Sequence, residues 1–137
     1  NILKINFVAL FTVLMLMSSS IWSLKLNSQH PEGYHYFHVI HLDDDAIRAG
    51  NIIIQPLVFS KDHDYDFIVA GTSAPIKLEI RDDHDKLIAT NYDEANSQFY
   101  SNMIFECHIS EMYKIVISGL ELPKDSKVKI FSKAHDK

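Results

Sequence analysis

A single cysteine, Cys107, occurs in the 137 residues of this sequence. One cysteine cannot form an intramolecular disulfide, so it is either buried and inert or a free thiol that can pair with another chain. Met103, Phe105 and Cys107 alternate along an apolar stretch and would share one face of a strand. We expect Cys107 to be buried there, because free cysteine packs as a small hydrophobe.

Basic residues are also in short supply. The chain has 13 Lys and Arg against 18 Asp and Glu, a formal net charge of −5. Lys4 is the one charged residue before Leu24, so the rest of the chain carries 12 basic against 18 acidic residues. No cluster of Lys and Arg with interleaved aromatics is present. Such a surface repels phosphate backbones, and we expect no nucleic-acid partner.

Motifs for catalysis are lacking as well. A nucleophilic serine is typically held in a G-x-S-x-G elbow, and Gly71-Thr72-Ser73 lacks the second glycine. Cys107 and His108 are adjacent, so on a strand their side chains point to opposite faces and cannot act as nucleophile and base. We therefore expect no catalytic residues and no enzyme activity.

A long apolar run lies near the start of the sequence. Residues 7–17 contain Thr12 as their one polar side chain, Lys4 precedes them, and the small-residue segment 18–23 follows. This pattern is typical of a secretory signal peptide. The sequence therefore predicts export, to the periplasm or to the extracellular face of a membrane.

Two alternatives remain open for residues 1–23. They are a cleaved signal peptide, which makes the protein secreted, or a retained N-terminal hydrophobic helix. Residues 5–24 are about twenty in number, long enough to serve as a membrane anchor. Residues 24–33 are polar and are predicted to be a linker, which leaves residues 34–137 as one folded domain.

The segment Tyr65–Asp82 has the clearest strand pattern and is placed at the centre of the predicted core. Apolar residues alternate with mostly polar ones on both sides of the turn-forming stretch 71–75, which indicates one buried and one solvent-facing side. We expect these two strands to form a β-hairpin. The alternating apolar residues are Tyr65, Phe67, Val69, Ile76, Leu78 and Ile80.

Further short strands separated by turn residues follow the same pattern. Residues 34–42 could also be helical, but their aromatic and β-branched content favours a strand. Pro56 indicates an edge strand or a bulge. Seven or eight strands with little helical periodicity predict an all-β fold, a jelly-roll-like antiparallel β-sandwich or else a barrel. The additional strands are expected at 34–42, 51–61, 87–91, 99–109, 113–118 and 128–132.

Several core and turn positions between residues 65 and 118 form a recognisable series. They are Tyr65-x-Phe67-x-Val69, Ile80-x-Asp82 followed by Leu87-Ile88-Ala89, the pair Ile104-Phe105, and Tyr113-x-Ile115-x-Ile117. In these positions the chain resembles the bacterial pre-peptidase C-terminal (PPC) type of jelly-roll β-sandwich. The resemblance implies a non-catalytic accessory or binding module of an exported protein, and it carries over no functional residues.

Three acidic loops, at 43–45, 62–66 and 82–85, are the candidate metal sites. Calcium prefers several carboxylate and carbonyl oxygens at a sharp turn. Asp82, Asp83 and Asp85 make the best candidate set, so calcium is the one possible cofactor. No loop matches the EF-hand spacing. Aspartate is also a good turn former, and we favour turn chemistry over calcium in these loops.

Histidines and aromatic residues are the remaining candidates for ligand contacts. His35 and His41 would share one face of a strand and His38 the other, so the three cannot converge on one metal without a bulge. We favour a surface or packing role for them. The aromatic residues can contact carbohydrate or protein, but we expect most of them in the core. This aromatic set is Tyr34, Tyr36, Phe37, Tyr92, Phe99 and Tyr100.

Together these patterns predict an exported accessory or structural subunit that acts through protein–protein contacts. An envelope or membrane protein is the expected partner, with the N-terminal helix anchoring the subunit in a membrane complex if it is retained. The alternative is a secreted module that binds calcium or carbohydrate.

Overall fold

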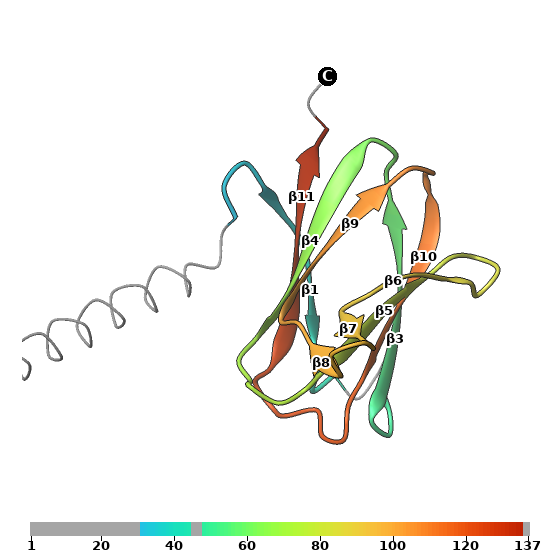
Figure 1. The fold of residues 1–137 in the computed structure, drawn as a ribbon. Helices are drawn as coiled ribbons and strands as arrows, with labels where there is room; N and C mark the ends of the chain where they lie inside the picture. The colour runs from blue at the N-terminus through green and yellow to red at the C-terminus, as the bar shows by residue number, and fades with distance from the viewer. Residues whose placement is uncertain (1–30, 45–47, 136–137) are drawn as a thin grey trace, which may run out of the picture.

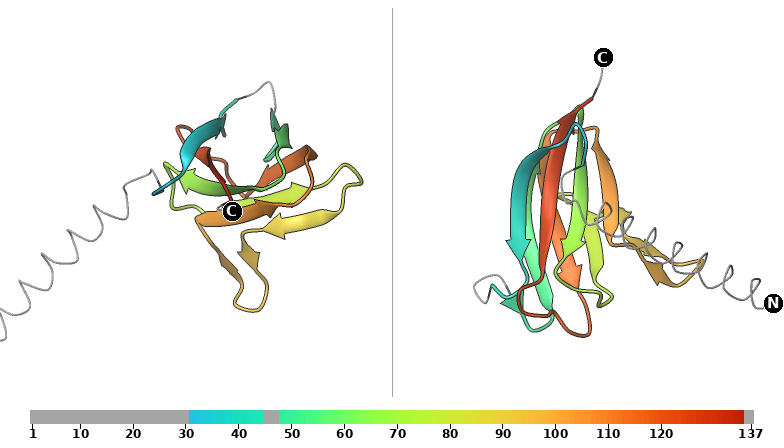
Figure 2. Two further views of the ribbon diagram at one scale, coloured as in Figure 1. Left: turned by 90° about the horizontal axis from the view of Figure 1, so that it is seen from above. Right: turned by 90° about the vertical axis from the view of Figure 1, so that its left-hand side faces the viewer.

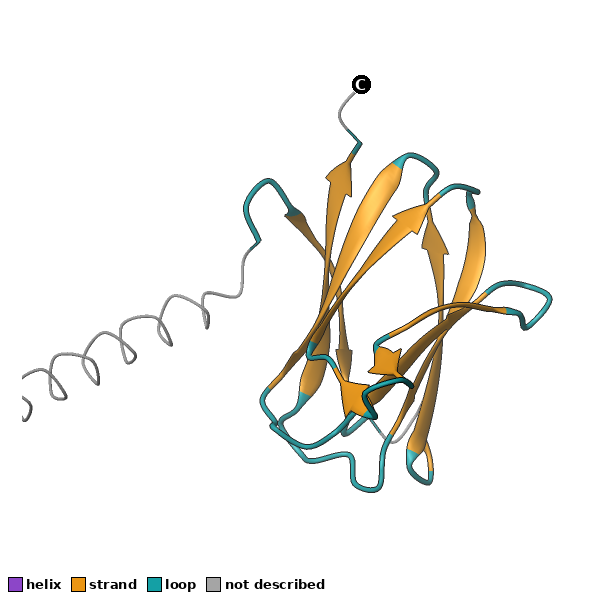
Figure 3. Cartoon of the chain, in the orientation of Figure 1, coloured by secondary structure: helices purple, strands orange, loops and turns teal. Residues whose placement is uncertain are grey.

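The computed structural model describes residues 31–44 and 48–135 (Figure 1). The predicted signal peptide or anchor, the N-terminal hydrophobic helix and most of the linker lie outside the described residues. Within these two ranges every regular element is a β-strand (Figure 3). Consequently the described part of the chain has no helix long and apolar enough to cross a membrane.

The strands form two packed antiparallel sheets and a small two-stranded ribbon (Figure 2). One sheet has the order β1-β11-β4-β9, the other has the order β2-β3-β10-β5-β6, and β7 pairs with β8. The all-β sandwich expected from the alternation is thus confirmed. The strands are β1 (His35–His41), β2 (Arg48–Ala49), β3 (Ile52–Phe59), β4 (His63–Ala70), β5 (Lys77–Arg81), β6 (Leu87–Thr90), β7 (Tyr92–Asp93), β8 (Gln98–Phe99), β9 (Asn102–Cys107), β10 (Glu111–Ser118) and β11 (Lys127–Ala134).

Eight of these strands have four or more residues, in agreement with the expected seven or eight. Numbered one to eight along the chain, they pair in a nested way: first with eighth, second with seventh, third with sixth and fourth with fifth. The pairs are β1 with β11, β3 with β10, β4 with β9 and β5 with β6. Successive pairs alternate between the two sheets, so the chain crosses repeatedly from one layer to the other.

The predicted hairpin between Tyr65 and Asp82 is wrong. β4 pairs with β11 and β9, whereas β5 pairs with β10 and β6 in the other sheet. The connection 71–76 crosses between the layers, and six residues easily span the ~10 Å that separates stacked sheets. Gly71 makes this crossing possible: its φ is +82°, and a Cβ there would lie 2.6 Å from the carbonyl oxygen of Asp125.

The core lies between the two sheets and is built from the alternating apolar residues. Phe59 is at its aromatic centre, with ring centroids 4.2 Å from Tyr65, 5.9 Å from Phe67 and 5.7 Å from Tyr113. Cys107 is fully buried, as expected. Residues buried from the two facing sheets include Ile40, Ile53, Leu78, Ile80, Phe105, Ile115, Ile117, Val128 and Ile130.

The structure agrees with the predictions for β1 and for Pro56, but not with the prediction for Asp66. Residues 35–41 form a strand rather than a helix. Pro56 lies on β3, and β2 pairs with only Ile52 and Ile53 of that strand. Asp66, expected on the solvent-facing side of β4, is buried with 4% of its surface exposed. It lies between neighbours on β9 and β11, and Asn102 donates a hydrogen bond to its carboxylate.

Candidate binding site

The predicted calcium loop joins β5 to β6. Asp82 Oδ1 accepts hydrogen bonds from the backbone N–H of His84 at 2.9 Å and of Lys86 at 2.8 Å. Because these bonds favour the ionised carboxylate, first of all the one from Lys86, they hold the pKa of Asp82 below its usual range. Asp85 has a positive φ of 63°, and its carbonyl accepts a bond from Arg81. The loop therefore has the turn chemistry that its aspartates favour.

Two of the three predicted calcium ligands lie together. A carboxylate oxygen of Asp82, one of Asp83 and one of Glu111 lie within 4.8 Å of one another. Asp85 is not in this group, and its Oδ1 lies 3.7 Å from Lys114 Nζ. Glu111 was missed because it is distant in sequence and reaches the loop only through the pairing of β10 with β5. Calcium binding here stays a prediction.

The three histidines of β1 do not meet. A β-bulge between Tyr36 and His38 brings His35 and His38 opposite residues of the same face of β11, whereas His41 pairs with an outward residue. Across residues 31–44 and 48–135, the acidic group at Asp82 is the one set of three close metal-ligating side chains. The bulge is thus present, but it does not bring the three histidines together as a metal site.

Cys107 and His108 lie on opposite sides of β9, as their adjacency predicts. Cys107 is buried, and its thiol lies 3.2 Å from the carbonyl of Ile109. The hydroxyl of Tyr113 donates to the same carbonyl at 2.8 Å, and burial is the main cause that raises the pKa of this phenol. The His108 side chain is exposed and lies beside Glu106. Cys107 and Tyr113 therefore hold the β9–β10 connection in place through the carbonyl of Ile109.

A cleft lies at the end of the sandwich opposite the β9–β10 connection. It is formed by the β4–β5 connection on one side and by β8 with the residues that follow it on the other. Its volume is about 290 Å³. The lining residues are Val69, Thr72, Ser73, Ala74, Pro75, Ile76, Ser97, Gln98, Phe99, Tyr100 and Ser101.

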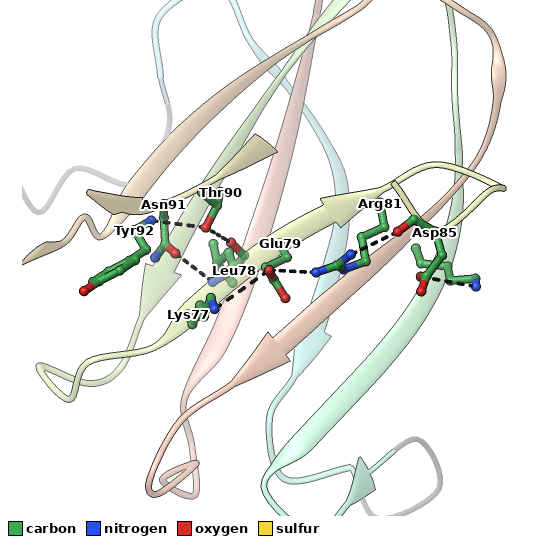
Figure 4. Close-up of polar contacts among 9 residues, drawn as sticks. Lys77, Leu78, Glu79, Arg81, Asp85, Thr90, Asn91 and Tyr92 are labelled. Carbon is green, nitrogen blue, oxygen red and sulfur yellow. Dashed lines mark hydrogen bonds and ion pairs between the residues drawn. The ribbon is translucent and has the colours of Figure 1, made fainter. Parts of the chain in front are cut away.

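Asn91 holds the two sides of this cleft together. It is 2% exposed, and its side-chain NH₂ donates to the carbonyls of Ile76 and Tyr100, both at 2.8 Å. Its Oδ1 accepts the backbone N–H of Leu78 at 2.7 Å (Figure 4). The backbone N–H of Tyr100 returns a bond to the Asn91 carbonyl. One buried amide therefore links β5, the end of β6 and the segment after β8.

The β7–β8 ribbon places aromatic rings at the rim of the cleft. Phe99 packs on Tyr92 of the paired strand with ring centroids 4.7 Å apart, and Phe99 remains 38% exposed. The ribbon projects from the body of the sandwich (Figure 2). Because the ring of Phe99 rests on Tyr92 rather than on the core, its other side remains available to solvent.

Tyr100 is oriented by Asp93. The Tyr100 hydroxyl donates to Asp93 Oδ2 at 3.1 Å, and Asn96 donates to the same oxygen at 2.7 Å. The bond from Asn96 is the main cause that lowers the pKa of the Asp93 carboxyl, and the bond to Asp93 raises the pKa of the Tyr100 phenol. Both pKa shifts are away from neutral pH, so the ionised Asp93 and the protonated Tyr100 that make this contact are each favoured.

Two open hollows adjoin the cleft around Pro75. The first, of about 410 Å³, is lined by residues that include Phe99, Leu120 and the charged Lys77. The second, of about 420 Å³, is lined by Ala74, Pro75, Leu120 and the charged Glu121. Leu120 is 90% exposed. The cleft and the two hollows therefore lie side by side at this end of the sandwich.

The expectation that most of the six candidate aromatic residues lie in the core is wrong, because none of them is buried. Phe37 packs on Phe59 and Tyr65, with ring centroids 5.7 Å and 5.2 Å away. Even so, Phe37 is 37% exposed; Tyr36, Phe99 and Tyr100 are exposed too, and Tyr34 and Tyr92 are half-buried. The alternation of apolar and polar residues could not predict the exposure of these rings. Phe99 and Tyr100 belong to the short ribbon and the residues just after it, outside the main sheets, and Tyr36 lies on the outer face of β1.

The outer face of β3 and β10 is mostly apolar, with Lys114 and Ser118 of β10 as its polar members. All four outward residues of β3 are apolar, and Val58 among them is 65% exposed. On β10, Met112 lies opposite Val58 and Val116 lies opposite Ile54. We call this set the β3/β10 face. Its members are Ile52, Ile54, Pro56, Val58, Met112 and Val116.

Charged residues border the β3/β10 face on one side. β5 presents Lys77, Glu79 and Arg81, and Glu79 Oε2 lies 3.8 Å from Lys77 Nζ and 3.1 Å from Arg81 Nη2 (Figure 4). The face therefore changes from apolar at β3 to ionic at β5.

No protein-family model, curated protein or solved structure matches this chain.

Proposed function

We propose that the chain is an exported, non-catalytic accessory subunit that acts through protein–protein contacts made by the β3/β10 face. The observation that carries the proposal is the absence of polar side chains at every outward position of β3. A solvated sheet normally alternates apolar inward with polar outward residues. Contiguous exposed apolar surface on a soluble domain marks an interaction site.

The position of the face also favours a partner. Beyond Ile53, β3 has no strand on its β2 side among the described residues, so an edge lies next to the apolar surface. Edge strands of natural proteins are usually protected by charges or by a covering element. Within the described residues, β3 has no outward charge and no element covering its edge beyond Ile53, and Pro56 is the protective feature that it carries. A partner that covers the face would bury both the side chains and the edge.

An envelope or membrane protein is the partner we propose. The N-terminal sequence pattern predicts export, to the periplasm or the extracellular face, and residues 5–24 would bring the subunit to a membrane if they are retained. The nested pairing of eight strands supports assignment of the sandwich as a jelly roll, which two Greek keys generate. This order is consistent with the PPC-type resemblance and its role as an accessory module.

The proposal is tested by lysine substitutions on the face. In the full chain, Ile54→Lys with Val58→Lys should abolish co-purification with its partner under mild detergent. The melting temperature should change little, because both side chains already face solvent. Ile109→Lys is the matched control, since Ile109 is 62% exposed at the β9–β10 connection. Equal recovery of the same companions with wild type and the double variant would refute the proposal.

A further inference from the structure

The cleft between the β4–β5 connection and the β7–β8 ribbon has an uncharged lining. None of its eleven residues carries a formal charge, although 23% of the chain is Asp, Glu, Lys or Arg. Binding sites for phosphate or carboxylate groups use Arg, Lys or helix N-termini. The cleft therefore suits a neutral ligand.

Its lining combines aromatic rings with hydrogen-bonding groups. Phe99 and Tyr100 lie at one side, and Thr72, Ser73 and Gln98 supply two hydroxyls and an amide. A sugar ring has the matching chemistry, with apolar C–H faces that pack on aromatic rings and hydroxyl edges that donate and accept hydrogen bonds. Ligand sites in general join apolar walls to a few placed polar groups in this way.

The cleft is also held in shape without a ligand. Asn91 bridges its two sides, and Thr72 Oγ1 accepts the backbone N–H of Ala74 at 2.9 Å within the β4–β5 connection. The backbone N–H of Val69 bonds to the carbonyl of Ser101 at 2.8 Å. A preformed site lowers the entropy cost of binding, which matters most for a small polar ligand that gains little from each contact.

We propose that this cleft binds a neutral carbohydrate, with Phe99 as the stacking platform. The adjoining hollows at Leu120 extend the site beyond one sugar unit, and Lys77 and Glu121 in their linings can hydrogen-bond further sugar hydroxyls, so a short oligosaccharide is a better fit than a monosaccharide. The cleft lies apart from the β3/β10 face and uses none of its residues. The carbohydrate site therefore does not depend on the proposed protein contact.

Titration calorimetry of the full chain in detergent tests this site with named probes. The neutral probes are the linear hexasaccharides of glucose, mannose, xylose and N-acetylglucosamine, and an oligogalacturonate hexamer is the anionic comparison. We expect at least one neutral probe to bind and the anionic probe to bind at least tenfold more weakly. Failure of all four neutral probes to bind at millimolar concentration overturns the proposal, and so does preferential binding of the anionic probe.

Variants locate the binding. Phe99→Ala should weaken the bound neutral probe at least tenfold, whereas Tyr36→Ala, which removes an exposed aromatic ring at the far end of β1, should leave the affinity unchanged. Because loss of Phe99 could disturb the ribbon, Ser73→Arg on the opposite wall provides an independent block of the cleft. His108→Arg is its control at the other end of the sandwich. Affinity that survives both Phe99→Ala and Ser73→Arg overturns the proposal.

Discussion

Two buried polar residues, Asn91 and Asp66, have roles that depend on groups from other parts of the fold. Asn91 has no motif around it, yet its side chain makes three hydrogen bonds to backbone groups of two separate segments, 76–78 and the segment at Tyr100. No sequence pattern distinguishes it from the other asparagines, because its role depends on backbone groups that the fold brings to it. The burial of Asp66 was missed for the same reason: alternation places it on the outer face, and its burial depends on the residues of β9 and β11 that pair beside it.

Asn91→Ala should destabilise the fold and open the cleft. The substitution leaves the N–H of Leu78 and the carbonyls of Ile76 and Tyr100 without their partner. Unsatisfied buried groups of this kind cost about 1–3 kcal/mol each, so we expect a loss of roughly 3 kcal/mol after relaxation and water entry. Urea unfolding measures it, with Asn51→Ala as the exposed comparison. A loss no larger than that of Asn51→Ala would contradict the role given to Asn91.

Asp66 should make stability depend on pH. Burial raises the pKa of its carboxyl, and the hydrogen bond from Asn102 opposes this only in part. The native state therefore binds a proton more tightly than the unfolded state does, whose aspartate pKa is about 3.9. Between this value and the raised native pKa, the free energy of unfolding should fall as pH rises, and the loss persists at higher pH.

Asp66→Asn removes this titration while keeping an acceptor for Asn102. The variant should be at least as stable as wild type at pH 7, and its advantage should shrink as the pH falls toward 4. Urea unfolding of both proteins across this range measures the difference. The account is contradicted if the variant is clearly less stable than wild type at pH 7 and this difference in stability shrinks as the pH falls. That result would show that the ionised carboxylate is favourable in the native state.

At the scale of elements, alternation predicted the eight longer strands and most of the side chains that face inward, but not the short strands β2 and β7. It could not predict which strands pair: Tyr65–Ala70 and Ile76–Arg81 have compatible inward faces, and a hairpin and a crossover bury them equally well. The deciding feature is the connection, where Gly71 passes against Asp125 of a distant loop. Long-range contacts of this kind leave no local signal in one sequence. The grouping of Glu111 with Asp82 was missed for the same reason.

Gly71 and Gly50 allow a matched test of the crossover. Both have a positive φ, +82° and +65°, but a Cβ at Gly50 meets nothing within 4 Å, whereas at Gly71 it meets backbone. Replacement by alanine costs roughly 1–2 kcal/mol for the left-handed conformation alone. Gly71→Ala should therefore cost clearly more than Gly50→Ala in urea unfolding. Equal losses would mean that the approach to Asp125 does not constrain the crossover.

At the scale of the whole molecule, the sandwich presents two separate surfaces. The β3/β10 face is mostly apolar and lies beside a strand edge of the described sheet, and the cleft is concave, uncharged and rimmed by aromatic rings. Such a division would let one accessory module hold a protein partner and a carbohydrate at the same time. The acidic loop at Asp82 lies at the opposite end from the cleft and has the hydrogen bonding of a turn.

Site-specific photocrosslinking tests the central claim, contact through the β3/β10 face, most directly. A photoreactive residue placed at Val58 in the full chain, in its native membrane or secreted fraction, should give one discrete crosslinked product. The same residue at Ile109, which is similarly exposed but lies off the face, should give none. A product of twice the chain mass would identify a second copy as the partner, and a larger heterologous product an envelope protein. No product at Val58, or equal products at both positions, would contradict the account.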